Sequence, residues 1–156
     1  EIHWIMIQRI QSVFLIISAV AIVLLYFFPL AVIGGHEDGA TLFIGTVALN
    51  DSAKVIVNAW PLRALCSIIL ILTLLSLFLY KRRVLQMRLT IYNMVLTFGM
   101  IGLGIFYLIQ GRNLHGGDIQ AQFFSIMPII SLILSYLAWR GIRRDYLMLR
   151  AVERLR

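Results

Sequence analysis

Charged residues are scarce in this chain of 156 residues. Asp, Glu, Lys and Arg together make up 13% of it, about half the share found in soluble domains, whereas apolar residues make up 61%. The mean hydropathy is +0.91, so the chain has too little polar surface to cover a globule in water. This composition excludes a soluble domain, a disordered chain and a collagen-like chain, and it predicts that the solvent of the protein is largely lipid.

Cysteine and the common catalytic motifs are also missing or nearly so. The one cysteine, Cys66, lies inside an apolar run, which excludes an intramolecular disulfide, a CxxC motif and a zinc framework. The sequence contains no P-loop, GxSxG, HExxH or dinucleotide-binding glycine pattern. No constellation of residues in the sequence therefore names a reaction, a cofactor or a metal.

What the sequence does contain is long apolar runs. These predict four transmembrane helices at about residues 10–33, 62–80, 89–110 and 119–140, joined by an outer loop 34–60, an inner loop 81–88 and an outer loop 111–118, with a cytoplasmic tail 141–156. The predicted fold class is an all-α membrane protein, a four-transmembrane-helix antiparallel bundle that forms a single membrane domain over residues 1–156. Pro128 lies within the fourth run and predicts a kink in the outward half of that helix.

The first run has an alternative interpretation as a cleavable signal sequence. Arg9 precedes it, and Ala19-Val20-Ala21 has the small-residue spacing that signal peptidase prefers. The apolar run continues for a dozen residues beyond Ala21, which favours a transmembrane helix instead. Met6 is a candidate natural start, and the sequence does not decide whether Glu1 to Ile5 is native.

The distribution of cations predicts the orientation. With an even number of crossings, both termini and the central turn share one side, which then holds eleven cations against three acidic residues, a balance of +8. The other side holds three cations against four acidic residues, a balance of −1. Because short loops rich in Lys and Arg stay in the cytoplasm, we predict a multi-pass protein of the cell inner (plasma) membrane with cytoplasmic N- and C-termini.

Two segments outside the predicted spans have patterns of their own. The β-favouring runs at residues 41–49 and 54–58 predict a small extracytoplasmic β-hairpin between helices 1 and 2. Residues 140–156 predict a C-terminal amphipathic cytoplasmic helix that can lie along the inner leaflet, with its arginines on anionic head groups. A plain topology anchor and the docking of a cytoplasmic partner are alternatives for this tail. Its short basic face lacks interleaved aromatic residues, which argues against nucleic acid.

Polar residues are few within the predicted spans. None of the four spans contains an ionisable residue at mid-membrane, which argues against a pump and weakens an ion-channel interpretation. Gln11 and Asn93 are predicted at similar depth near the inner leaflet and could hydrogen-bond across helices one and three. Two groups of small residues predict close packing of helices, within the protein or between copies of it: Gly99 with Gly102, and Ser131 with Ser135 and Ala138.

The predicted outer loops hold the residues best able to bind a metal or to do acid–base chemistry. They are His36, Glu37, Asp38, His115 and Asp118. The two histidines share no motif spacing, and polar residues are ordinary in loops. We therefore interpret these five residues as solvated loop residues and predict no metal or catalytic site.

Three short motifs carry a resemblance to a known family. They are Met6-Ile7-Gln8-Arg9-Ile10-Gln11, Leu85-Gln86-Met87-Arg88-Leu89, and Arg143-Arg144-Asp145 with Glu153-Arg154-Leu155-Arg156. On these motifs the chain resembles domain-of-unknown-function family 4293. The members of this family are uncharacterised integral proteins of the bacterial inner membrane and are familiar from Bacteroidetes. The resemblance runs over nearly the whole chain from Met6, and it departs at Glu153, where the family is associated with Asp. It implies four helices and an outer loop after the first, it implies no activity, and it places any family-wide role at the cytoplasmic side.

The sequence favours a non-catalytic accessory or scaffold subunit of a membrane complex, with no cofactor and no metal. The alternative is a small membrane enzyme or carrier acting on a lipid-like substrate. The expected partners are anionic head groups of membrane lipids at the cytoplasmic face and a second copy or another membrane protein, but not nucleic acid. The candidate interaction or lipid-contact residues are Gln8, Arg9, Gln11, Arg88, Asn93, Arg143, Arg144, Asp145, Arg150 and Arg154. The sequence names neither the biological process nor the partner, ligand or oligomeric state.

Overall fold

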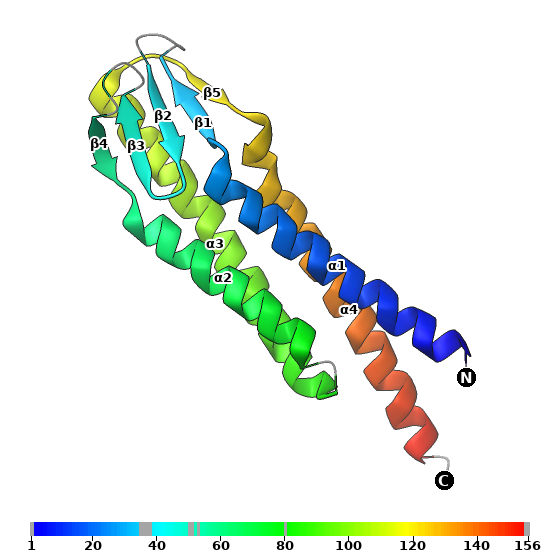
Figure 1. Cartoon of the computed structure of the whole chain (residues 1–156). Coiled ribbons are helices and arrows are strands. Elements are labelled where there is room, and N and C mark those ends of the chain that lie inside the picture. Colours follow the sequence, from blue (N-terminus) through cyan, green and yellow to red (C-terminus); the bar gives the residue numbers. More distant parts are fainter. Residues whose placement is uncertain (1, 35–38, 50–51, 53, 80, 155–156) are drawn as a thin grey trace.

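Four long helices lie side by side along most of the molecule (Figure 1). The computed structural model describes residues 2–34, 39–49, 52, 54–79 and 81–154, with the backbone alone for residues 2–9, 115 and 154. The helices are α1 (Ile2–Phe27), α2 (Trp60–Phe78), α3 (Arg83–His115) and α4 (Met127–Arg154). Consecutive helices run in opposite directions, and both α1 and α3 pack against α2 and α4.

All four helices are long and apolar enough to cross a membrane. Large apolar side chains point away from the bundle along their length, as expected where lipid is the solvent, and include Ile16, Val20, Ile71, Val95 and Ile133. The prediction of a mostly helical, multi-pass membrane protein is therefore confirmed. One end of the bundle carries a β-sheet and is called the sheet end below, and the opposite end carries both chain ends and the α2–α3 turn and is called the termini end (Figure 1).

The small sheet is antiparallel throughout and has five strands in the order β4-β3-β2-β1-β5. The strands are β1 (Ala31–Ile33), β2 (Ala40–Phe43), β3 (Thr46–Leu49), β4 (Val55–Asn58) and β5 (Ile119–Ala121). The prediction was a two-stranded hairpin from residues 41–49 and 54–58. The sheet instead has five strands, and residues 41–49 contribute to two of them. They are divided at Gly45, whose φ of 113° favours glycine and makes the tight turn between β2 and β3.

The first helix ends earlier than residue 33, the predicted end. Pro29 has no amide hydrogen to continue the helix, and its ring disfavours the helical conformation at Phe28. The following residues form β1, which pairs with β2 on one side and with β5 on the other. The first hydrophobic run is therefore long because it includes a strand and not because the helix is longer. This strand is paired on both edges, and its side chains are buried.

The fourth helix also differs from its prediction, which began it at residue 119. Residues 119–121 form β5, a 3-10 turn η1 (Phe123–Ile126) follows, and α4 begins at Met127. Pro128 therefore lies in the first turn of α4, where a missing amide hydrogen costs nothing, and the kink predicted from it within the helix does not occur. Stacked rings of Phe28 and Phe124, with centroids 4.0 Å apart, join the end of α1 to η1.

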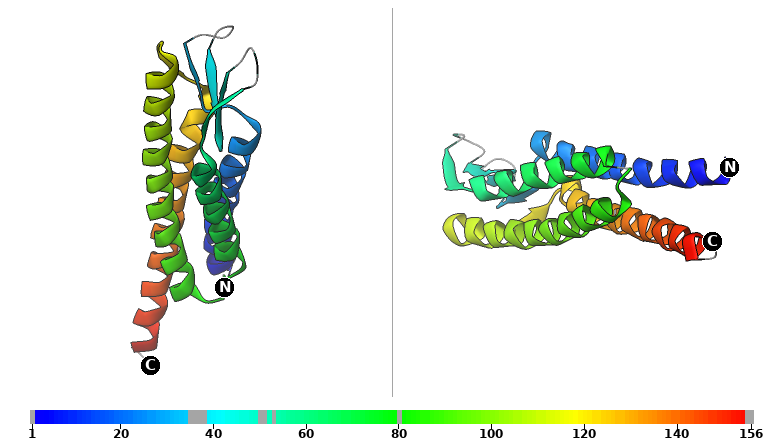
Figure 2. Two further views of the ribbon diagram at one scale, coloured as in Figure 1. Left: turned by 90° about the vertical axis from the view of Figure 1, so that its left-hand side faces the viewer. Right: turned by 90° about the horizontal axis from the view of Figure 1, so that it is seen from below.

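At the termini end the helices are longer than predicted. Most of the predicted inner loop 81–88 belongs to α3, which begins at Arg83, and the predicted tail 141–156 continues α4 without a break to Arg154. The left-hand view of Figure 2 shows this end of α4 projecting beyond the α2–α3 turn, and the beginning of α1 also extends past that turn (Figure 1). The predicted helix of the tail is therefore present, as the last turns of α4 rather than as a separate helix.

The sheet packs against the part of α3 at the sheet end, and α3 is longer than a helix needs to be to span a bilayer. A Cβ atom at Gly111 of α3 would stand 2.8 Å from Ile33 Cδ1 and 3.4 Å from Val47 Cγ1, so glycine allows the sheet to lie close to this helix. Ile33, Leu42 and Val47 join Met100 and Tyr107 in one apolar core. The sheet is therefore fixed to the bundle by burial of its inner face.

Candidate functional site

A layer of buried hydroxyl and amide groups crosses the middle of the bundle. Ser18 of α1 lies 2.7 Å from Ser131 and 3.4 Å from Ser135, hydroxyl to hydroxyl, and both partners belong to α4. All three side chains are fully buried. The small-residue group predicted on the fourth helix therefore serves packing within the chain, where it allows α1 and α4 to approach closely.

Asn93 of α3 joins this layer to α2. Its Nδ2 donates to Thr73 Oγ1 at 3.0 Å and to Ser135 Oγ at 3.4 Å, while Thr73 Oγ1 donates to the carbonyl of Ile69 at 2.8 Å. Asn93 Oδ1 is buried and meets no donor among the described residues. The predicted hydrogen bond between Gln11 and Asn93 does not form, because α1 and α3 do not lie next to each other in the bundle and each side chain finds a nearer helix.

Gln11 pairs instead with α4, closer to the termini end. Its Nε2 donates to Asp145 Oδ2 at 2.8 Å, and both side chains are buried. A Cβ atom at Gly141 would stand 2.9 Å from Gln11 Cγ, so the glycine makes room for the amide to cross the face of α4. Two predicted candidate residues thus meet in one interhelical bond that secures α1 to α4 where the uncharged spans end.

Buried polar groups from all three family-like motifs lie at the termini end. Gln11 comes from the first motif, Gln86 from the second and Asp145 from the third, and none is more than 8% exposed. Their burial indicates that these motif residues hold the helices together. The exposed cations beside them in the sequence are the ones available for contacts outside the protein.

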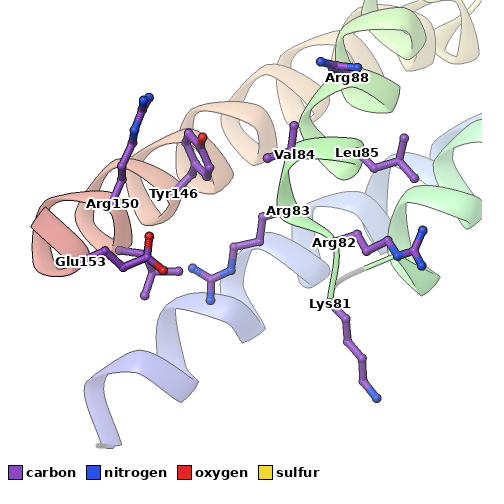
Figure 3. Close-up of a pocket in the computed structure, with 10 residues that line it drawn as sticks. Lys81, Arg82, Arg83, Val84, Leu85, Arg88, Tyr146, Arg150 and Glu153 are labelled. Atoms are coloured by element: carbon purple, nitrogen blue, oxygen red, sulfur yellow. The ribbon is translucent and has the colours of Figure 1, made fainter.

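A concave surface lies at this same end and is called the basic groove here. It has a volume of about 760 Å³ and separates the beginning of α3 from the last turns of α4 (Figure 3). Its lining residues are Lys81, Arg82, Arg83, Val84, Leu85, Arg88, Tyr146, Leu149, Arg150 and Glu153. In Figure 3, Val84 and Tyr146 face each other across the groove, with Arg88 and Arg150 above them and Arg83 below.

The basic groove gathers two predicted candidates, Arg88 and Arg150, and adds residues that were not predicted, chiefly Arg83 and Tyr146. The sequence feature that the lining residues share is their position on one face of a helix or directly before it. Tyr146, Leu149 and Glu153 recur at helical spacing along the side of α4 that faces α3, and the run Lys81-Arg82-Arg83 precedes α3 directly. These two segments lie close together only because the bundle folds, so the groove could not be located from the sequence.

The other candidate residues do not gather at one site. Arg143 lies over the ring of Trp139, with its Cζ atom 5.3 Å from the ring centroid, and Arg144 is exposed on α4. The backbones of Gln8 and Arg9 belong to α1 and that of Arg154 to α4, but their side chains lie outside the described part. Of the outer-loop residues, His36, Glu37 and Asp38 also lie outside it, as does the side chain of His115.

A second, smaller cavity of about 180 Å³ lies toward the sheet end and is almost wholly apolar. Helices α1 to α4 and strand β2 all contribute to its walls, which include Leu25, Leu42, Leu62, Met100 and Ile129. Its one hydroxyl, that of Ser125, donates to the carbonyl of Leu30. Within the described chain, no group of three or more His, Cys, Asp or Glu residues is arranged to hold a metal ion.

Comparison with known proteins agrees with the resemblance carried by the three motifs. The family model described as Domain of unknown function (DUF4293) matches residues 7–155, which is almost the entire chain. No curated protein matches the chain. The chain therefore belongs to the DUF4293 family of domains of unknown function.

Proposed function

We propose that this protein is an accessory or scaffold subunit of a membrane complex in the inner (plasma) membrane of a bacterium, and that the projecting end of α4 holds the partner. The observation that carries the proposal is the uninterrupted course of α4 past the end of the bundle (Figure 2). A helix that leaves its own bundle presents a face that nothing in the described chain covers.

That face combines apolar and cationic side chains. Leu147 is 52% exposed and Met148 is 36% exposed, and Arg143 and Arg144 are exposed one turn earlier. On a helix these residues point away from Ile142 and Asp145, which are buried against the bundle. Exposed apolar residues bordered by cations, beyond the predicted span that ends at residue 140, are typical of a surface that docks an acidic amphipathic partner.

Native mass spectrometry of the protein extracted in a mild detergent tests the proposal. We expect a stoichiometric species heavier than one chain of 17.8 kDa. The double variant Leu147→Ala with Met148→Ala should release the partner, since it removes the apolar centre of the docking face. The matched control is Ile133→Ala with Leu137→Ala, which changes exposed residues of the same helix within the span and should leave the complex intact. A single chain of 17.8 kDa in every preparation would contradict the proposal.

The proposed orientation places the termini end in the cytoplasm and the sheet end outside. In support, the termini end carries Lys81, Arg82, Arg83, Arg88 and the arginines from Arg140 to Arg150. The described cations at the sheet end are only Lys54, Arg63 and Arg112. Arg63 lies against the sheet, where its Nε donates to the carbonyl of Ile44 at 3.3 Å.

Cysteine labelling in intact cells tests this orientation. The native Cys66 is fully buried in α2 and should not react with a membrane-impermeant maleimide. We expect Ser52→Cys, which is exposed beside the sheet, to react from outside the cell, and Ala151→Cys, which is exposed on α4, to react only after the membrane is opened. The reverse pattern would overturn the proposed orientation without affecting the fold.

A second candidate function is an enzyme or carrier for a lipid-like substrate, and the apolar cavity toward the sheet end is the observation that favours it. A volume of about 180 Å³ suits a short segment of an acyl chain. The same mass spectra separate the two candidates, because a carrier would be seen without a protein partner whether or not it retains a lipid. A scaffold would retain a protein partner.

A further inference from the structure

The basic groove has a strong excess of positive charge. Five of its lining residues are cations, namely Lys81, Arg82, Arg83, Arg88 and Arg150, whereas Glu153 is its one acidic residue. The cations come from two elements that are far apart in the sequence, the start of α3 and the end of α4. Like charges gathered from separate elements repel one another, so a bound anion would relieve their repulsion.

Arg83 gives a more specific indication. Its Nη1 atom is buried, yet it meets no hydrogen-bond acceptor among the described residues. Figure 3 shows its side chain extending from the first turn of α3 toward the end of α4. A guanidinium presents its donors in a planar fork that matches the oxygen atoms of a phosphate, and a buried donor without an acceptor is costly. An anion with several acceptor oxygens would satisfy it.

Part of the groove wall is apolar, which favours a lipid over a soluble anion as the ligand. Val84, Leu85 and Leu149 line it together with the cations. Arg88 directly precedes the uncharged run of α3 that begins at Leu89, so one edge of the groove lies where the hydrocarbon of the bilayer begins. Cations next to apolar walls at this depth complement a phosphate head group and the upper part of its acyl chains.

We propose that the basic groove is a binding site for one anionic glycerophospholipid of the leaflet at the termini end. The lipid phosphate accepts hydrogen bonds from Arg83, Arg88 and Arg150 add positive charge on the other side of the groove, and the glycerol and upper acyl carbons lie against Val84, Leu85 and Leu149. This site goes beyond the proposed scaffold function, since the docking face at Leu147 and Met148 lies on the opposite side of α4. The two proposals can fail separately.

Lipid titration followed by native mass spectrometry tests the site, with phosphatidylglycerol and phosphatidylcholine of matched acyl chains as probes. We expect one phosphatidylglycerol to bind at least tenfold more tightly than phosphatidylcholine. The variant Arg83→Gln, Arg88→Gln, Arg150→Gln should lose at least tenfold in affinity for phosphatidylglycerol, because a cation near the bilayer surface contributes about fivefold to the binding of an anionic lipid.

The matched control is the variant Arg140→Gln, Arg143→Gln, Arg144→Gln, which removes three exposed cations from the same helix end but outside the groove. It should change the affinity by less than threefold. An equal loss in both variants would mean diffuse attraction of lipids to a basic surface and would overturn the site, as would no loss in either. If the triple variant does not fold, Arg83→Gln alone should still lose about fivefold, and an unchanged affinity in that single variant would also overturn the site.

Soluble anions distinguish the source of the phosphate. Inorganic phosphate and glycerol 3-phosphate at millimolar concentration should leave phosphatidylglycerol bound, since neither can use the apolar walls of the groove. Displacement of the lipid by either anion would show a site for a soluble phosphate compound and would contradict the assignment to a membrane lipid.

Discussion

Alanine in place of Gly117 should destabilise the protein by about 4 kcal/mol, because it adds a steric clash with the backbone to a strained conformation. Gly117 has a φ of 98°, and a Cβ atom there would stand 2.5 Å from Gly34 Cα. The neighbouring amide of Gly34 donates to the carbonyl of Asp118 at 3.0 Å, so the two glycines meet where β1 is hydrogen-bonded to the segment entering β5. No side-chain rotation can relieve this clash, because the Cβ atom would meet a backbone atom.

Gly116→Ala provides the matched control. Gly116 also has a positive φ, 76°, but a Cβ atom there would meet no atom within 4 Å. This variant should therefore cost only the conformational strain, about 2 kcal/mol. The free energy of unfolding is measured by titrating mixed micelles with denaturing detergent and following the far-ultraviolet circular dichroism. Equal losses in the two variants would show that the close approach of Gly117 to Gly34 does not contribute to stability.

Leucine in place of Ser131 should have the second largest effect, a loss of about 3 kcal/mol, since extra methylene and methyl groups in a closely packed interface force the helices apart. Ser131 is fully buried and its hydroxyl lies 2.7 Å from that of Ser18, in the interface between α1 and α4. Separating these helices would also strain the bond between Gln11 and Asp145 nearer the termini end.

Ser131→Ala distinguishes the packing contribution from that of the hydrogen bond. Alanine keeps the small volume and removes the hydroxyl, so we expect a loss of only about 0.6 kcal/mol, the average for an interhelical hydrogen bond within a membrane protein. The same unfolding titration applies. A larger loss for alanine than for leucine would mean that hydrogen bonding, rather than the close approach of α1 and α4, determines the stability of this interface.

The burial of Gln11 and Asp145 changes how the family-like motifs are interpreted. From the sequence, these residues were candidates for contacts outside the protein, and a role of the family was expected at the cytoplasmic side. In the structure their side chains bond to each other inside the bundle, with Gly141 providing the space. The functional candidates that remain exposed at this end are arginines, and only some of them, such as Arg88 and Arg150, share a concave surface.

The sequence alone was sufficient to predict the helical class, the four apolar spans and the family. Hydrophobicity along a chain is a local property, and a bilayer imposes a minimum length on each span. The apolar spans can therefore be found from the order of the residues alone. The sequence also indicated the β-favouring segments between the first two spans. Each of these predictions depends on neighbouring residues only, which is why the fold keeps the number and type of these segments and changes their bounds.

Only the tertiary structure decided where the apolar runs change from helix to strand. Residues 31–33 and 119–121 carry no charge and lie in runs long enough to extend a helix. They become strands because each supplies the backbone partner of the other across the sheet. The same reason applies to the polar residues and the basic groove: Gln11 meets Asp145, and Arg83 lies near Tyr146, through pairings of helices distant in sequence. Which groups meet across a bundle depends on which helices become neighbours, and that is set by the packing of all four at once.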